Sequence, residues 1–191
     1  MKVDIERIRT EATALANRNG IDGLSMNELA AALGIRPPSL YAHVDGIAAV
    51  RRLLALHGLR ELEQGVARLT AGKAGPDAVR ALMNGYRGFA RKNPGLYAAM
   101  VPTPPKSDTD WRDAMERLKL TLIASLQGYD LSGPDGVHAL RGMRSLVHGF
   151  VSLEASGALN HPVSRDASFA WLVEGFLRML APFEAEQPAG R

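Results

Sequence analysis

The chain has 191 residues, a net charge of +3 at pH 7 and a pI near 9.4, a size that allows one large domain or two small ones. No run approaches the roughly 18 apolar residues of a membrane span, and the charged first residues do not resemble a signal peptide. Cysteine is absent, which excludes disulfides and cysteine-ligated metal sites and agrees with a cytoplasmic protein. The small positive excess permits a nucleic-acid partner without requiring one.

The first predicted element is an amphipathic helix over residues 2–19. Its apolar residues, among them Ile8, Ala12 and Leu15, recur on one stripe at the helical period. The dipeptide at Asn19 and Gly20 predicts its end. This pattern indicates a scaffold helix that packs on the elements after it.

Residues 25–44 predict two short helices joined by a tight turn. Ser25 and Glu28 have the spacing of a capping box, which marks a helix start. Gly34 stands where the first helix must stop, since glycine tolerates the left-handed conformation of a C-cap. Pro37 and its neighbour suit the first turn of the second helix. Two helices in this arrangement form a helix-turn-helix, which places its second helix in the major groove of DNA.

The remaining sequence predicts six further helices, because apolar residues keep a period near 3.6 between breaks rich in Gly and Pro. No strand signal or internal repeat is present. The expected fold is therefore all-α, with about nine helices. We expect a helix-turn-helix DNA-binding head over 1–46, a helical ligand-binding and dimerisation domain over 47–182, and a disordered tail over 183–191. The six further helices span residues 47–70, 77–92, 95–101, 111–129, 135–158 and 166–180.

The motif L-A-x-x-L-G-I-x-x-x-S-L-Y-x-H-V, which begins at Leu29, resembles the N-terminal DNA-binding domain of the TetR/AcrR family of bacterial transcriptional regulators. Residues 144–159 resemble the C-terminal regulatory domain of a subgroup that carries Trp-His-Gly in this helix, with Val147 in place of Trp. The resemblance implies a homodimeric, ligand-responsive regulator of the repressor type that binds a palindromic operator in double-stranded DNA.

Eight residues are the candidate DNA contacts. Arg36 lies at the start of the recognition helix, where an arginine can pair with guanine and the adjacent prolines offer apolar surface to a thymine methyl. The resemblance implies that Tyr41 contacts phosphate, and the alternative for Tyr41 is packing in the core. The alternative for Arg36 is a solvated side chain that makes no DNA contact. The full set is Ser25, Asn27, Arg36, Pro37, Pro38, Ser39, Tyr41 and His43.

One position departs from the family pattern. Ile47 stands where relatives commonly carry a lysine that meets phosphate at the start of the fourth helix. Arg51, Arg52 or the free amides at this helix N-terminus are the possible substitutes.

A concentration of aromatic and methionine side chains in the C-terminal part indicates a pocket for an unknown small-molecule effector, since pockets between bundle helices are mostly apolar. For each residue taken singly, plain core packing is an equally good interpretation. His148 and Glu154 are the polar residues of interest in an otherwise apolar helix. The candidate pocket residues are Met83, Tyr86, Phe89, Tyr97, Met100, Trp111, Met115, Met143, Val147 and Phe150.

The last helix has an apolar face wide enough for a dimer interface, and the family resemblance implies pairing through the last two long helices. A two-fold symmetric dimer would read a palindromic site. The small residues Gly149, Ala155 and Gly157 in the preceding helix would allow close approach. The candidate interface residues are Phe169, Leu172, Val173, Phe176, Leu177 and Leu180.

An enzyme is the main competing class. No nucleophile–base pair, phosphate-binding loop or metal-binding spacing occurs among the histidines and carboxylates, so we expect no catalytic residues, no metal and no cofactor. The second alternative is a helical interaction or ligand-binding module that has lost DNA binding. The steep dependence of DNA affinity on salt would discriminate it from a regulator.

Overall fold

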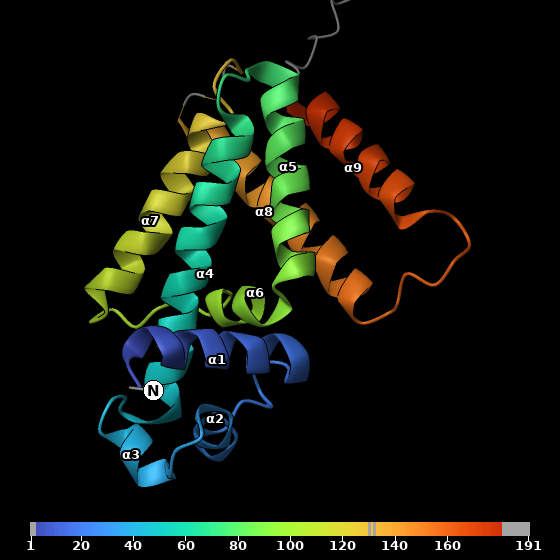
Figure 1. Ribbon diagram of the computed structural model, residues 1–191. Coiled ribbons are helices and arrows are strands. Elements are labelled where there is room, and N and C mark those ends of the chain that lie inside the picture. The colour runs from blue at the N-terminus through green and yellow to red at the C-terminus, as the bar shows by residue number, and fades with distance from the viewer. Residues whose placement is uncertain (1–2, 130, 132, 181–191) are drawn as a thin grey trace, which may run out of the picture.

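The computed structural model describes residues 3–129, 131 and 133–180, so the predicted tail over 183–191 lies outside the described part. Within that part the regular structure consists of nine helices and no strand, which confirms the all-α prediction (Figure 1). None of these helices is both long and apolar enough to cross a membrane. The helices are α1 (Ile5–Asn19), α2 (Met26–Leu33), α3 (Pro37–Tyr41), α4 (Gly46–Thr70), α5 (Gly75–Lys92), α6 (Pro94–Met100), α7 (Thr109–Ala124), α8 (Pro134–Ala155) and α9 (Arg165–Leu180).

Several helix ends differ from the predicted ones. Helix α7 was expected to continue to Tyr129 but ends at Ala124, where i to i+3 hydrogen bonds such as Leu126 N to Ile123 O take over. Helix α8 ends at Ala155 rather than at residue 158. Gly157 adopts a φ of 73°, a left-handed conformation that favours glycine and stops the helix.

The helix-turn-helix forms for the local reasons that the sequence indicates. Ser25 Oγ accepts a hydrogen bond from Glu28 N at 3.3 Å and so caps α2, as the spacing predicts. The Glu28 carboxylate accepts from the Ser25 hydroxyl at 3.0 Å, whereas in a full capping box it would pair with the Ser25 backbone N–H. Gly34 has a φ of 70° and its backbone N–H donates back to α2. Leu40 is fully buried and fixes α3 against the other two helices of the head. These contacts hold α3 at the end of the molecule farthest from α5 and α9 (Figure 1).

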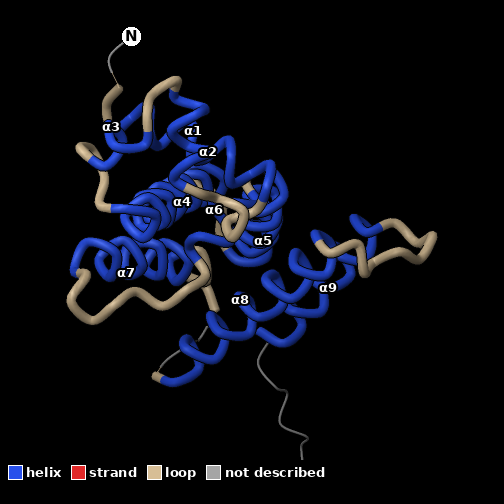
Figure 2. Tube along the Cα trace, turned by 90° about the horizontal axis from the view of Figure 1, so that it is seen from below, coloured by secondary structure: helices blue, strands red, loops and turns tan. Residues whose placement is uncertain are grey.

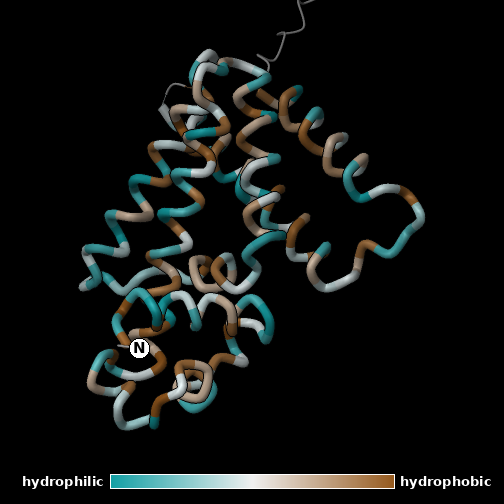
Figure 3. The backbone as a smooth tube through the Cα atoms, in the orientation of Figure 1, coloured by the Kyte–Doolittle hydropathy of each residue, from teal (hydrophilic) through white to brown (hydrophobic). Residues whose placement is uncertain are grey.

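Two hydrophobic cores are present, and helix α4 contributes to both. Its first half places Val50, Leu54 and Ala55 in the core of the head, whereas Leu59 and Leu62 belong to the core of the C-terminal bundle. Apolar residues line the inner faces of the helices around each core (Figure 3). The boundary expected after residue 46 falls at the start of α4. It does not divide the two cores, because α4 packs into both.

Helix α6 lies between the head and the bundle and packs on α1 and α4 (Figure 1). It shares its residues between the two cores: Leu96 and Ala99 pack into the head, and Tyr97 and Met100 into the bundle. Seen from below, α9 lies on the opposite side of the molecule from α7, and α8 runs between them (Figure 2). The head thus contacts the bundle through a short helix that both cores bury.

The approach of α6 to α1 is close enough to require glycine at position 95. Gly95 N donates a hydrogen bond to Asn17 Oδ1 at 2.8 Å. A Cβ at this position would lie 2.3 Å from the backbone carbon and 2.5 Å from the oxygen of Ala16. Because these are backbone atoms, no side-chain rotation can relieve the overlap, and α6 would have to move away from α1.

We expect Gly95→Ala to lower the free energy of unfolding by about 3 kcal/mol, at the upper end of the cost of overpacking, because the new methyl meets backbone. Chemical denaturation monitored by circular dichroism measures this. The matched control is Gly88→Ala on α5, where a Cβ meets no atom within 4 Å; it should raise stability by up to about 1 kcal/mol through helix propensity. Equal effects of the two substitutions would contradict the close packing of α6 on α1.

Candidate nucleic-acid interface and interhelical cavities

Helix α3 and the turn after it present a cluster of exposed side chains on a buried support. Leu40 is 0% exposed, whereas Tyr41 beside it is 56% exposed, so the core-packing alternative for Tyr41 does not apply. Arg36 is exposed as the N-cap residue of α3, with no side-chain hydrogen bond to that helix. Pro38, Ser39 and His43 are also exposed, and Pro37 is half-buried. The geometry presents a cation, hydroxyls, an imidazole and apolar ring surface at one end of the molecule.

The two candidate DNA contacts at the start of α2 differ in whether their side chains are already hydrogen-bonded within the chain. The half-buried hydroxyl of Ser25 makes two hydrogen bonds with Glu28, one from its backbone N–H and one to its carboxylate. Asn27 is exposed on the first turn of the same helix. Asn27 is therefore free to meet an external acceptor, whereas Ser25 would have to give up its cap.

The start of α4 does not offer both of the arginines suggested as substitutes for the family lysine. Arg52 Nη2 donates to Asp108 Oδ1 at 2.7 Å and to Asp110 Oδ2 at 3.0 Å, which ties α4 to the start of α7. The guanidinium lowers the pKa of the Asp108 carboxyl, so this pair is ionised at neutral pH. Arg52 is thus committed within the chain. Arg51, 3.6 Å from Asp22, makes only a long ion pair.

A further contact between head and bundle joins α1 to α4. Arg9 Nη1 lies 2.7 Å from His57 Nδ1, and Arg9 also pairs with Glu6. Burial, with the Arg9 cation adding to it, lowers the pKa of His57. The imidazole is therefore neutral at pH 7 and can accept a hydrogen bond from the guanidinium.

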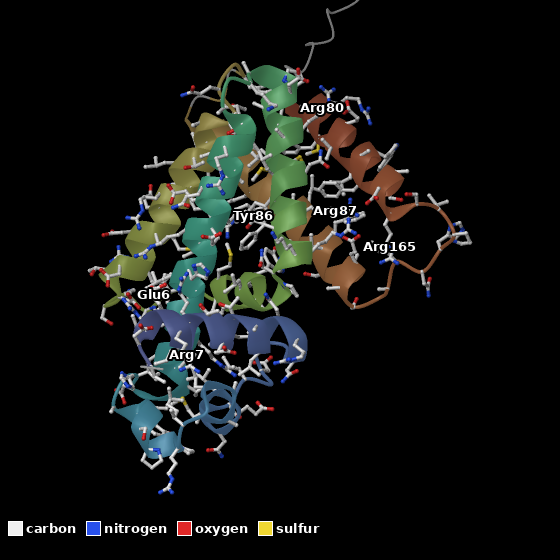
Figure 4. The ribbon with its side chains drawn as sticks, in the orientation of Figure 1. Glu6, Arg7, Arg80, Tyr86, Arg87 and Arg165 are labelled. Carbon is white, nitrogen blue, oxygen red and sulfur yellow. The ribbon has the colours of Figure 1, made fainter. Side chains whose placement is uncertain are left out.

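The first cavity of the bundle has a volume of about 570 Å³ and is formed by α4, α5, α6, α7 and α8. Four of the predicted pocket residues line it: Tyr86, Tyr97, Met100 and Met115. Tyr86 lies in the interior between α4 and α5 (Figure 4). The other lining residues are Leu59, Val101, Leu118, Lys119, Leu122, Ile123, Val137, Leu140, Arg141, Arg144, Ser145 and His148.

The structure places the other six predicted pocket residues elsewhere. None of them lines either cavity described here. The reason is that helical periodicity marks an apolar face without showing whether that face meets a void or another helix. Three are fully buried in the bundle core and three pack in or against it: Met83, Met143, Val147, Phe150, Phe89 and Trp111.

A second cavity, of about 760 Å³, lies between the bundle and the loop that joins α1 to α2. It contains charges of both signs, among them Asp22 and Arg91. Tyr97 and His148 line both cavities, and Tyr97 Oη lies 2.8 Å from His148 Nδ1. This hydrogen-bonded pair therefore stands between the two cavities.

A buried ion pair connects α5 to α8 and α9. Arg87 Nη2 donates to Glu154 Oε1 at 2.7 Å and lies 2.8 Å from Asp166 Oδ1. Its guanidinium carbon is 5.0 Å and 4.7 Å from the ring centres of Phe150 and Phe169, within the range of cation–π contacts. Sequence reasoning noticed Glu154 but missed Arg87, which Figure 4 shows on the side of α5 toward α8 and α9. The signal was a charged residue directly beside the apolar stripe of α5.

The predicted dimer residues of α9 face the interior of their own chain. Phe169 is 0% exposed, and Val173 and Phe176 are each 2% exposed. These three side chains and Leu180 cover the bundle core of their own chain, whereas Leu172 and Leu177 are half-buried against it. The exposed apolar side chains of α9 are instead Trp171, at 74%, and Met179, at 69%.

Comparison with known proteins gives two family matches. Residues 8–45 match the model of "Bacterial regulatory proteins, tetR family", and residues 79–176 match "Tetracyclin repressor-like, C-terminal domain". A curated relative from Mycobacterium tuberculosis, named as an HTH-type transcriptional regulator, is 33% identical over 99% of this chain and 85% of its own length. Another, YobS from Bacillus subtilis, is 34% identical over 87% of this chain and 86% of its own.

Solved structures share the fold. A protein from Rhodococcus has a TM-score of 0.79 at 21% identity and covers 92% of this chain and 94% of its own. A TetR variant from Acinetobacter baumannii, in complex with minocycline, has a TM-score of 0.66 at 25% identity and covers 94% of this chain and 99% of its own.

We expect Glu154→Gln to lower the free energy of unfolding by about 3 kcal/mol at pH 7, because it leaves the buried Arg87 without its main partner. Arg87 holds the pKa of Glu154 below its usual range. The ion pair therefore stabilises the fold above the ordinary carboxyl pKa, and this contribution is lost as the pH falls through the lowered pKa.

Urea denaturation of both proteins between pH 7 and pH 3 tests this. The difference between wild type and Glu154→Gln should be largest near pH 7 and should shrink below about pH 4.3, the ordinary value for a glutamate. The control is Glu116→Gln, which removes an exposed i,i+3 pair with Lys119 and should change stability by less than about 0.5 kcal/mol. A pH-independent difference for Glu154→Gln would contradict the ionic origin of the effect.

Proposed function

Because the chain belongs to the TetR family of DNA-binding transcriptional regulators, we propose that it acts as a ligand-responsive repressor that binds a palindromic operator as a homodimer. The observation that carries the proposal is the cluster of exposed polar and basic side chains on α3 and at its two ends, held by the buried Leu40. A short helix supported in this way can enter a major groove without losing its own packing.

Within this surface the residues divide by what each can contact. Arg36 is proposed to read a base edge, since a free guanidinium can pair with guanine O6 and N7. Tyr41, His43 and Asn27 are proposed to contact phosphate, and Ser39 can meet either a base or the backbone. With Arg52 paired to aspartates, the amides at the start of α4 are the remaining substitute for the family lysine, aided by Arg51.

Dimerisation is proposed through α8 and α9, but on the face opposite the one that the sequence suggested. Trp171, Gly175 and Met179 are spaced by four residues and form one outward ridge of α9. On α8, Gly149 and the exposed Leu153 are candidates for the neighbouring ridge. Glycines beside large apolar side chains allow the helices of two copies to approach closely. A two-fold axis at this surface would relate the two recognition helices by symmetry.

The ligand response is proposed to pass through α6 and α4. Tyr97 and Met100 line the first cavity, while Leu96 on the same short helix packs into the head. A ligand that moves α6 would push on α1 at Gly95 and tilt α4, which both cores bury. The two recognition helices would then no longer match half-sites one helical turn apart, and the DNA would be released.

Selection of binding sites from random duplex DNA at near-physiological salt should recover a palindrome. Arg36→Ala should relax the preference at one position in each half-site, at a cost of about 1–3 kcal/mol per contact. The control, Arg117→Ala on the exposed face of α7, should leave the selected sequence unchanged. Absence of any enriched sequence, with a folded protein, would favour an interaction module that has lost DNA binding.

Trp171→Glu should convert the dimer to a monomer, because it places a charge in the centre of the proposed interface. Light scattering at micromolar concentration measures the change, and operator affinity should fall in parallel. Leu120→Glu is the matched control, since Leu120 is a 57% exposed apolar residue on α7, which lies across the molecule from α9. A Trp171→Glu protein that remains dimeric would rule out this face.

A further inference from the structure

The charge of the first cavity is of one sign. Its lining contains Lys119, Arg141 and Arg144, and it contains no aspartate or glutamate. Lys119 pairs with Glu116 at 2.8 Å, but no described carboxylate pairs with Arg141 or Arg144. The second cavity, by contrast, contains Asp22 and Glu154 as well as Arg91. The first cavity therefore favours an anion, whereas the second contains charges of both signs.

The basic side chains form a stripe along α8. Arg141, Arg144 and His148 follow one another at intervals of three and four residues, which places them on one face of the helix. That face borders the cavity, opposite Met115 and Leu122 of α7. A ligand between the two helices would meet the guanidinium groups of α8 on one side and, apart from Lys119, hydrocarbon of α7 on the other.

Apolar side chains, both exposed and buried, make up much of the remaining lining of this cavity. Val101, Ile123 and Val137 are each between 39% and 48% exposed, although large apolar side chains gain from burial, and all three line the cavity. The methionine side chains in the lining, Met100 and Met115, can adapt to the shape of an apolar ligand. A volume of about 570 Å³ lies in the range of small-molecule sites.

Two phenols lie next to the cations, and because Tyr97 Oη is paired with His148 Nδ1, Tyr86 is the hydroxyl that can donate to a ligand. Tyr86 and Tyr97 are buried, and burial raises the pKa of both hydroxyls, so they stay protonated at neutral pH. Arg144 is the cation that acts on Tyr86, which places the guanidinium and the phenol in reach of one acceptor. A carboxylate has two oxygens that can accept from both.

We propose that the first cavity binds a monocarboxylate with an extended apolar body, with Arg144 and Arg141 holding the carboxylate and the residues of α6 and α7 covering the chain. This assignment deepens the proposed ligand response and rests on it, since it names the chemical class of the effector. The length of the ligand's hydrocarbon chain sets the affinity through apolar burial, and the arginines select for the negative charge.

Isothermal titration of the purified full chain with decanoate, below its micellar concentration, tests the assignment. Decan-1-ol and decylammonium are the uncharged and cationic probes of the same length. We expect decanoate to bind one molecule per chain, at least tenfold more tightly than either probe. Affinity should rise about fourfold per added methylene from hexanoate to decanoate.

The double variant Arg141→Gln with Arg144→Gln should lower decanoate affinity at least tenfold and leave decan-1-ol binding unchanged. Both arginines are exposed, and circular dichroism confirms the fold of the variant. Arg144→Lys should keep part of the affinity, because charge is retained without the bidentate geometry. Arg117→Gln, on α7 but outside the cavity lining, is the control and should bind decanoate as wild type does.

Three results would each overturn the assignment: no binding of decanoate, equal binding of decan-1-ol, or unchanged decanoate binding by the double variant. Site selection on the same preparation separates this from the proposed function. A protein that recovers a palindrome but ignores decanoate is a regulator with another class of effector. If the protein binds decanoate but selects no DNA site, the cavity assignment stands and the proposed repressor function is wrong.

Discussion

The burial of one helix in two hydrophobic cores is the constraint on which the rest of the structure depends. Helix α4 has 25 residues, about 37 Å of continuous helix. Its first turns are covered by α1 to α3, and its later turns by the bundle. Because close-packed interiors do not deform gradually, a displacement of α4 in the bundle must move the head as well. The ion pair of Arg52 with Asp108 and the contact of Arg9 with His57 add polar links at the same junction.

The position of the first cavity follows from this constraint. Its walls include Leu59 of α4 and Tyr97 of α6, two helices that also pack on the head. A ligand there would contact the two helices that connect the bundle with the head in the proposed ligand response. The Arg87 ion pair lies in a different part of the structure. It connects α5 to α8 and α9 and so fixes these three helices relative to one another.

The two parts of the molecule were predictable to different degrees. The helix-turn-helix depends on short-range chemistry: a helix cap at Ser25, a left-handed glycine at position 34 and prolines that fit a first helical turn. Such signals lie within a few residues and can be read directly. The cavity depends on how five helices meet. Met83 and Met115 lie on equally apolar stripes, yet Met83 is fully buried in the core and Met115 lines the void.

The sequence by itself determined the all-α class, the order of the helices and the position of the recognition helix, because periodicity, caps and breaks are local properties of the chain. Tertiary structure decided which apolar face turns inward. The last helix has apolar residues on more than one side, and only its packing on α5 and α8 shows that Phe169 belongs to the core while Trp171 faces outward. It also decided the partners of the buried charges. Arg87 and Glu154 are 67 residues apart in the chain, and no local rule connects them.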